Sequence, residues 1–84
     1  MADLQALTEA IEVGDRKSAV RLTGEAVEEK LDPRTILASM TAAMEVVGGR
    51  FQRNEIYVPE MLIAARAMKE ALAVLEPVLV AADI

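Results

Sequence analysis

The chain has 84 residues, a formal net charge of −5 and 54% apolar residues, and it contains neither cysteine nor histidine. These absences exclude a disulfide framework, thiolate or imidazole metal sites, and histidine-dependent catalysis within this chain. We find no basic stripe, no signal-peptide pattern and no apolar run near the roughly 18 residues of a membrane span, so we expect a cytoplasmic protein with neither nucleic-acid nor membrane partners.

Two short helices are predicted first along the chain. Asp3 can cap the first helix, Gly14 is expected to end it, and Asp15 is placed to cap the second. The second helix is expected to end near Lys30. The apolar residues at helical spacing are Leu4, Leu7 and Ile11 in the first helix, and Ala19, Leu22, Ala26 and Val27 in the second.

A third helix is predicted to start at Asp32-Pro33, because the aspartate can cap free backbone amides and proline suits the first turn. Gly48-Gly49 either ends this helix or marks a place where something packs too closely to admit a side chain. We favour close packing, because the apolar spacing continues as far as Phe51. The apolar face comprises Ile36, Leu37, Met40, Met44, Val47 and Phe51.

A turn over residues 53–56 separates this helix from a fourth, and Asn54 tolerates the left-handed backbone that the turn requires. Pro59 opens the fourth helix, so Val58 is expected to be extended, and Pro77 should kink or end the helix. The predicted inner face comprises Met61, Leu62, Ala65, Met68, Leu72 and Leu75. Four helices with short connections predict an all-α antiparallel four-helix bundle, formed by residues 1–84 as one domain.

Two features could carry chemistry or binding. The paired glutamates of the first two helices would suit a di-iron bundle, but that site also needs histidine, so solvated helix faces are the favoured interpretation. Both aromatic residues, Phe51 and Tyr57, fall at the junction of the last two helices, near Ile56 and Val58. This apolar group is either a plug that closes the bundle or a surface exposed to a ligand or partner, and both interpretations stay open on physical grounds.

The junction and its flanks carry a specific resemblance. Val47–Phe51, Glu55–Met61 and Ala64–Lys69 closely resemble the amino-terminal cap of corrinoid proteins, and Leu75-Glu76-Pro77 matches the end of that cap. The corrinoid family includes the cobalamin module of methionine synthase and the corrinoid subunits of methylamine, methanol and aryl-methyl-ether methyltransferases. The resemblance covers essentially the whole chain.

The resemblance implies a four-helix cap that rests on the upper face of the corrin ring and shields the methyl–cobalt bond in one-carbon metabolism. The two capping positions correspond to Phe51 and Val58, with Met61 beside them as a third cofactor-binding residue. Val58 is smaller than the leucine commonly found there, and Asn54 replaces a usual glycine. The cap would contact cobalamin from one face only, so we do not expect tight binding of free corrinoid by this chain alone.

Family members continue into a Rossmann-like domain whose Asp-x-His-x-x-Gly motif supplies the lower cobalt ligand, and we expect that domain to be absent here because the chain has no histidine. By itself the chain is expected to be non-catalytic, with the Rossmann-like domain and a methyltransferase as partners. Its exposed lid is expected to drive self-association. The alternative is a stand-alone helical interaction or dimerisation module that has lost the cofactor.

Overall fold

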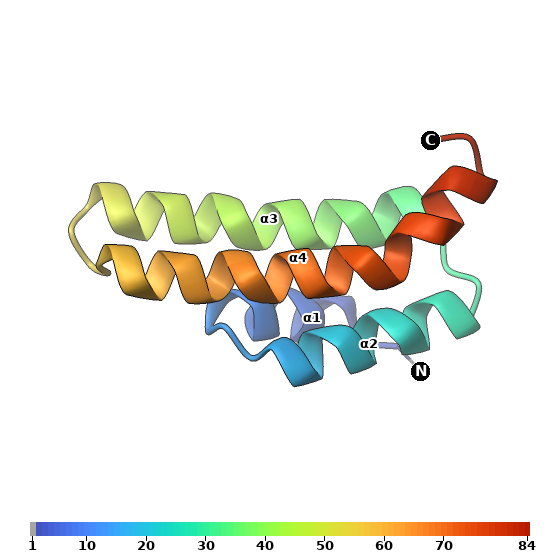
Figure 1. Cartoon of the computed structure of the whole chain (residues 1–84), viewed down its shortest axis with the longest axis horizontal. Helices are drawn as coiled ribbons and strands as arrows, with labels where there is room; N and C mark the ends of the chain where they lie inside the picture. The colour runs from blue at the N-terminus through green and yellow to red at the C-terminus, as the bar shows by residue number, and fades with distance from the viewer. Residues whose placement is uncertain (1) are drawn as a thin grey trace.

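The computed structural model describes residues 2–84, and all regular structure in this range is helical. The elements are α1 (Leu4–Glu12), α2 (Arg16–Glu28), α3 (Pro33–Gln52) and α4 (Val58–Ala81). Helices α3 and α4 form a long antiparallel hairpin, and the shorter α1 and α2 pack along one part of it (Figure 1). Helix α2 packs mainly on α4, and α1 mainly on α3. The predicted four-helix bundle is confirmed, and none of the described helices is long and apolar enough to cross a membrane.

The predicted helix starts are confirmed by side-chain hydrogen bonds. The carboxylates of Asp3, Asp15 and Asp32 accept from backbone N–H groups at the starts of α1, α2 and α3, at 3.0, 3.2 and 2.9 Å. Each bond satisfies an amide that has no partner within its helix. Gly14 adopts φ of +75° after α1, as expected of a glycine that ends a helix.

The core is built from aliphatic side chains and, unexpectedly, from a stripe of alanines on α4. Leu7, Ile11, Ile36 and Met40 are fully buried, as predicted. The buried residues of α4 are Ala64, Ala67, Ala71 and Leu75.

The predicted inner face of α4 is therefore confirmed at Leu75, confirmed in part at Met68 and Leu72, and wrong at Leu62. Met68 and Leu72 only flank the core, and Leu62 is 60% exposed. Alanine suits this contact because α4 packs against both α2 and α3, and a small side chain lets helix backbones approach closely.

Two further expectations need correction. The close-packing interpretation of Gly48-Gly49 is wrong: a Cβ on Gly48 would meet no atom within 4 Å, and one on Gly49 would meet only the Arg53 side chain. Helix α3 passes through both glycines because its backbone hydrogen bonds need no side chain.

The predicted extended conformation of Val58 is also wrong. The extended residue before α4 is Tyr57 (φ −108°, ψ 170°), and Val58 is already helical. Proline only biases the preceding residue, and here the helix start is set by the cap.

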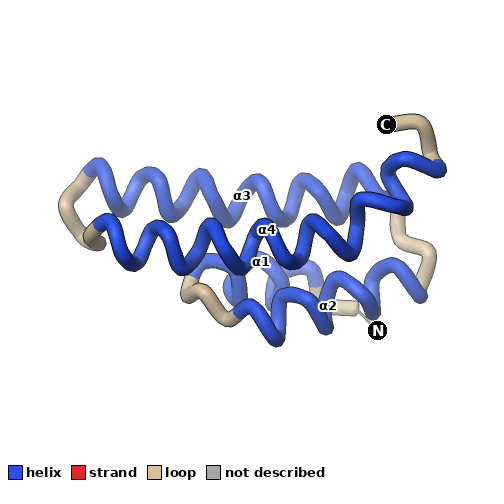
Figure 2. The backbone as a smooth tube through the Cα atoms, in the orientation of Figure 1, coloured by secondary structure: helices blue, strands red, loops and turns tan. Residues whose placement is uncertain are grey.

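Pro77 lies inside α4, which continues to Ala81. The last turns bend away from the line of the helix (Figure 2), as expected where a proline removes one hydrogen bond and crowds the preceding turn. The expected kink is thus present, and the residues after it form a helical tail.

Candidate functional site

The free end of the α3–α4 hairpin carries exposed apolar side chains. Helices α3 and α4 extend past the ends of α1 and α2, so the last turns of α3 and the first turns of α4 lack cover from them (Figure 1). Phe51 is 37% exposed, Tyr57 73% and Val58 49%. A plug that closes a bundle would be buried, so the geometry favours an exposed apolar surface. We call this end of the molecule, residues 51–61, the hairpin tip.

The turn at the hairpin tip is held by local hydrogen bonds. Asn54 adopts φ of +62°, and the N–H of Glu55 donates to the Arg50 carbonyl at 2.8 Å, which closes α3 in the way that a left-handed residue allows. On the other side, the Tyr57 N–H donates to Glu60 Oε1 at 3.1 Å, so Glu60 fixes the start of α4. These hydrogen bonds therefore fix the end of α3, the start of α4 and the length of the turn between the two helices.

An ion pair also lies within this turn. Arg53 Nε donates to Glu55 Oε2 at 2.6 Å. This hydrogen bond raises the pKa of Arg53 and lowers the pKa of Glu55, because it favours the charged form of each group. The charges of the turn are thus neutralised against each other.

The structure places the three predicted site residues at the same end of the bundle. Phe51 is in the last turn of α3, Val58 in the first turn of α4, and Met61 about one turn further along α4. Phe51 and Val58 are exposed, and Met61 is half-buried. The surface they form can exclude water from an apolar group, but it offers no nucleophile or general base.

The base of the hairpin tip is tied to α1 by a second ion pair. Arg50 Nη2 lies 3.3 Å from Glu12 Oε1, and Glu12 is the less exposed partner. This bond joins the last turn of α1 to α3 just below the exposed segment. It therefore supports the position of the hairpin tip relative to the rest of the bundle.

Sequence reasoning missed a second exposed apolar area on α4. Leu62 and Ile63 are 60% and 53% exposed, and Pro59 lies on the same side of the helix. The spacing of apolar residues did not predict this exposed area, because apolar residues occur on every side of the first half of α4. The large number of apolar residues in α4 was the signal in the sequence for an exposed apolar area. A helix that is apolar on all sides needs more cover than two short helices can supply.

A model of the B12 binding domain family matches residues 3–76 of this chain. The chain belongs to this family. The resemblance to the helical cap of corrinoid proteins is thereby confirmed. No solved structure was found to match the chain.

Several corrinoid proteins are similar to the chain. A corrinoid protein of Desulfitobacterium hafniense is 37% identical over 78 residues, which cover 92% of this chain and 36% of that protein. Monomethylamine corrinoid protein 2 of Methanosarcina acetivorans is 32% identical over 72 residues (84% of this chain, 33% of that protein). Trimethylamine corrinoid protein 2 of the same organism is 38% identical over 64 residues (75% and 30%). The chain thus spans about a third of the length of these relatives.

Proposed function

We propose that this chain is the cap of a corrinoid-dependent methyl-transfer system, and that its hairpin tip covers the upper face of methylcobalamin. Phe51 and Val58 would lie over the cobalt-bound methyl group, with Met61 supporting them from α4. The observation that carries the proposal is the exposure of Phe51 and Val58 on a turn whose two helix ends are fixed by hydrogen bonds.

The chemistry of such a cover fits the residues present. A reactive alkyl–cobalt bond needs protection from water and competing reagents, which apolar side chains supply without an acid, a base or a metal ligand. The cover must also leave before the methyl group is transferred. Apolar contacts are non-directional and separate without breaking a polar network, so they suit a lid that opens repeatedly.

The partners would be a Rossmann-like corrinoid-binding domain and a methyltransferase. Two relatives are named for monomethylamine and trimethylamine, which supports a system that takes methyl groups from methylated amines. The chain itself would contribute one face of the cofactor site and no catalytic group.

The proposal is tested by supplying the missing face of the site in trans. The chain is mixed with the corrinoid-binding part of the Desulfitobacterium hafniense relative loaded with methylcobalamin, and the rate of methylcobalamin photolysis is measured. A cap over the methyl group holds the methyl radical near cobalt and favours recombination, so we expect photolysis to slow several-fold. The double variant Phe51→Ala/Val58→Ala should remove most of this protection.

A matched control is Val80→Ala, because Val80 is an exposed apolar residue in the last turn of α4, outside the hairpin tip. This variant should protect as well as the unmodified chain. If the unmodified chain binds the cofactor domain but leaves the photolysis rate unchanged, the shielding role is wrong.

A stand-alone interaction module is the second candidate, and the same exposed residues favour it, since contiguous exposed apolar surface often marks a protein contact. Because the cap is also expected to self-associate, the two functions are separated by analytical gel filtration over a wide concentration range together with the photolysis measurement. Self-association that Phe51→Ala abolishes, together with no effect of the chain on methylcobalamin, would support the interaction module.

A further inference from the structure

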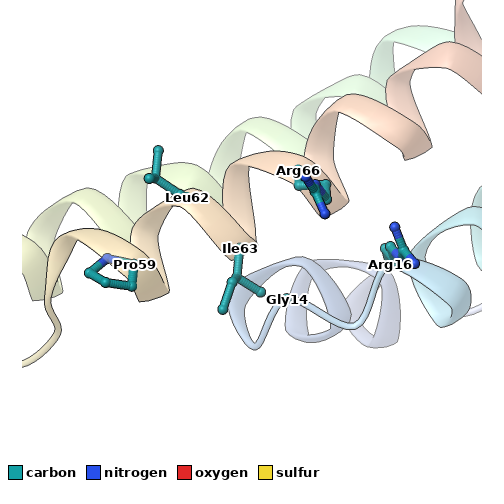
Figure 3. Close-up of a pocket in the computed structure, with 6 residues that line it drawn as sticks. All are labelled: Gly14, Arg16, Pro59, Leu62, Ile63 and Arg66. Atoms are coloured by element: carbon teal, nitrogen blue, oxygen red, sulfur yellow. The ribbon is translucent and has the colours of Figure 1, made fainter.

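A pocket of about 450 Å³ lies on the flank of the bundle, between α4 and the turn that joins α1 to α2. Its lining residues are Gly14, Arg16, Pro59, Leu62, Ile63 and Arg66. Figure 3 shows Ile63 reaching toward Gly14, with Arg66 of α4 and Arg16 of α2 on the same side of this contact. The pocket therefore combines an apolar floor with two guanidinium groups at one end.

We propose that this pocket binds a small amphipathic carboxylate, an organic acid with a branched or aromatic apolar body. Ligand pockets of roughly 300–1,000 Å³ are typically apolar with a few polar groups that fix orientation, and this pocket has that composition. The apolar body would lie on Leu62 and Ile63, and the carboxylate between Arg16 and Arg66. The pocket adjoins the hairpin tip at Pro59, but Phe51, Val58 and Met61 do not line it.

The charge of the pocket favours a monoanion. Arg16 Nη1 lies 3.3 Å from Glu70 Oε2, while Arg66 has no ion-pair or hydrogen-bond partner within residues 2–84. Two guanidinium charges and one carboxylate charge leave one net positive charge. A carboxylate balances this charge, and the planar fork of a guanidinium matches its two oxygens.

The floor of the pocket is held in place. A Cβ on Gly14 would overlap the Ile63 side chain, so the α1–α2 turn and α4 are already in contact here. Arg16 is the first residue of α2, whose N-cap Asp15 fixes the helix start through Ser18. The backbone around the pocket therefore needs little rearrangement before a ligand enters, and the ordering cost falls mainly on the exposed side chain of Arg66.

The test is an amide NMR titration of the full chain with sodium benzoate at neutral pH and low salt. We expect saturable shifts at the amides of Gly14, Ile63 and Arg66, with a dissociation constant on the order of 1 mM for so small a ligand. Benzamide, which has the same ring without the charge, should bind about tenfold more weakly, as should acetate, which lacks the ring.

Variants locate the site. Arg66→Gln should weaken benzoate binding by about tenfold, because it removes the unpaired guanidinium. Arg34→Gln is the matched control, since Arg34 borders a different apolar hollow on α3, and it should leave binding unchanged. Both residues are exposed, so both variants should keep the helical circular dichroism spectrum of the unmodified chain.

Three results would overturn the proposal: shifts spread over the surface without saturation, an Arg66→Gln variant that binds benzoate normally, or inorganic phosphate binding as tightly as benzoate. The last result would mean a simple anion site in which the apolar floor has no role. Because Phe51 and Val58 lie outside the pocket, failure here leaves the shielding test of the hairpin tip unaffected.

Discussion

Gly14 lies against Ile63 so closely that a Cβ on Gly14 would overlap Ile63 Cγ2 and lie 3.3 Å from Ile63 Cβ. Gly14 also adopts φ of +75°, a backbone conformation that side chains with a Cβ rarely take. The turn between α1 and α2 thus reaches its position on α4 only because residue 14 has no side chain. Both residues also line the pocket between α4 and the α1–α2 turn.

Gly14→Ala should therefore destabilise the bundle. Backbone strain and overpacking against Ile63 together should lower the free energy of unfolding by about 2–4 kcal/mol, measured by urea denaturation. Gly24→Ala is the matched control, because a Cβ there meets no atom within 4 Å and the residue is helical. An unchanged urea midpoint for Gly14→Ala would contradict the close contact.

Gly48→Ala should stabilise the chain. The glycine is inside α3 with open space at its Cβ position, so alanine should add about 0.5–1 kcal/mol through helix propensity alone. Gly49→Ala should gain less, because its Cβ would lie 3.2 Å from Arg53 Nη1 and that side chain would have to shift. A loss of stability in Gly48→Ala would restore the close-packing interpretation.

The exposed hairpin tip should contribute little to stability despite its apolar character. Phe51→Ala is expected to lower the free energy of unfolding by about 1–2 kcal/mol, less than the loss of a fully buried side chain, because Phe51 is 37% exposed in the folded chain. Leu75→Ala removes a fully buried side chain and should cost about 2–5 kcal/mol. Comparable urea midpoints for the two variants would show that Phe51 is packed in solution.

The alanine stripe of α4 should not accept larger residues. Ala67→Leu would place extra carbons where α4 packs against the bundle, and we expect a loss of about 1–3 kcal/mol by thermal or urea unfolding. Ala73→Leu changes an exposed position of the same helix and should be nearly neutral. Equal effects of the two substitutions would mean that the stripe is not the packed face.

Acid should weaken the start of α2. Hydrogen bonds from the side chain and backbone of Ser18 lower the pKa of Asp15 in the folded chain, so the ionised carboxylate is favoured by folding. A lowered folded pKa gives stability that is present above the unfolded pKa and lost as pH falls through the folded pKa, which here means below about pH 4.

Asp15→Asn isolates this contribution, because asparagine caps a helix but does not titrate. Urea midpoints of the variant should fall less steeply with acidification than those of the unmodified chain. Identical pH profiles for the two proteins would show that the Asp15 cap does not contribute to acid unfolding.

The helix boundaries followed from local chemistry that the sequence displays. Asp3, Asp15 and Asp32 are caps whose partners lie two or three residues away, and Gly14 and Asn54 end helices by adopting positive φ. The location of the hairpin tip was predictable for the same reason, since Asn54 and Pro59 bracket the turn. These features depend on neighbours within one helical turn.

Tertiary packing decided which side of α4 is buried and how much of the α3–α4 hairpin remains exposed to solvent. The first half of α4 is apolar on several sides, so spacing could not distinguish Ala64 and Ala67 from Leu62 and Ile63. Helices α1 and α2 are short and α2 packs on α4, which favours alanine at the contact and leaves the larger side chains near the hairpin tip in water. Arg16 and Arg66 come to line one pocket in the same way. These two residues are fifty positions apart in the chain, so they come together only when α2 packs against α4. Their relative position depends on how the surfaces of the two helices fit together, and the residue spacing within one helix does not predict it.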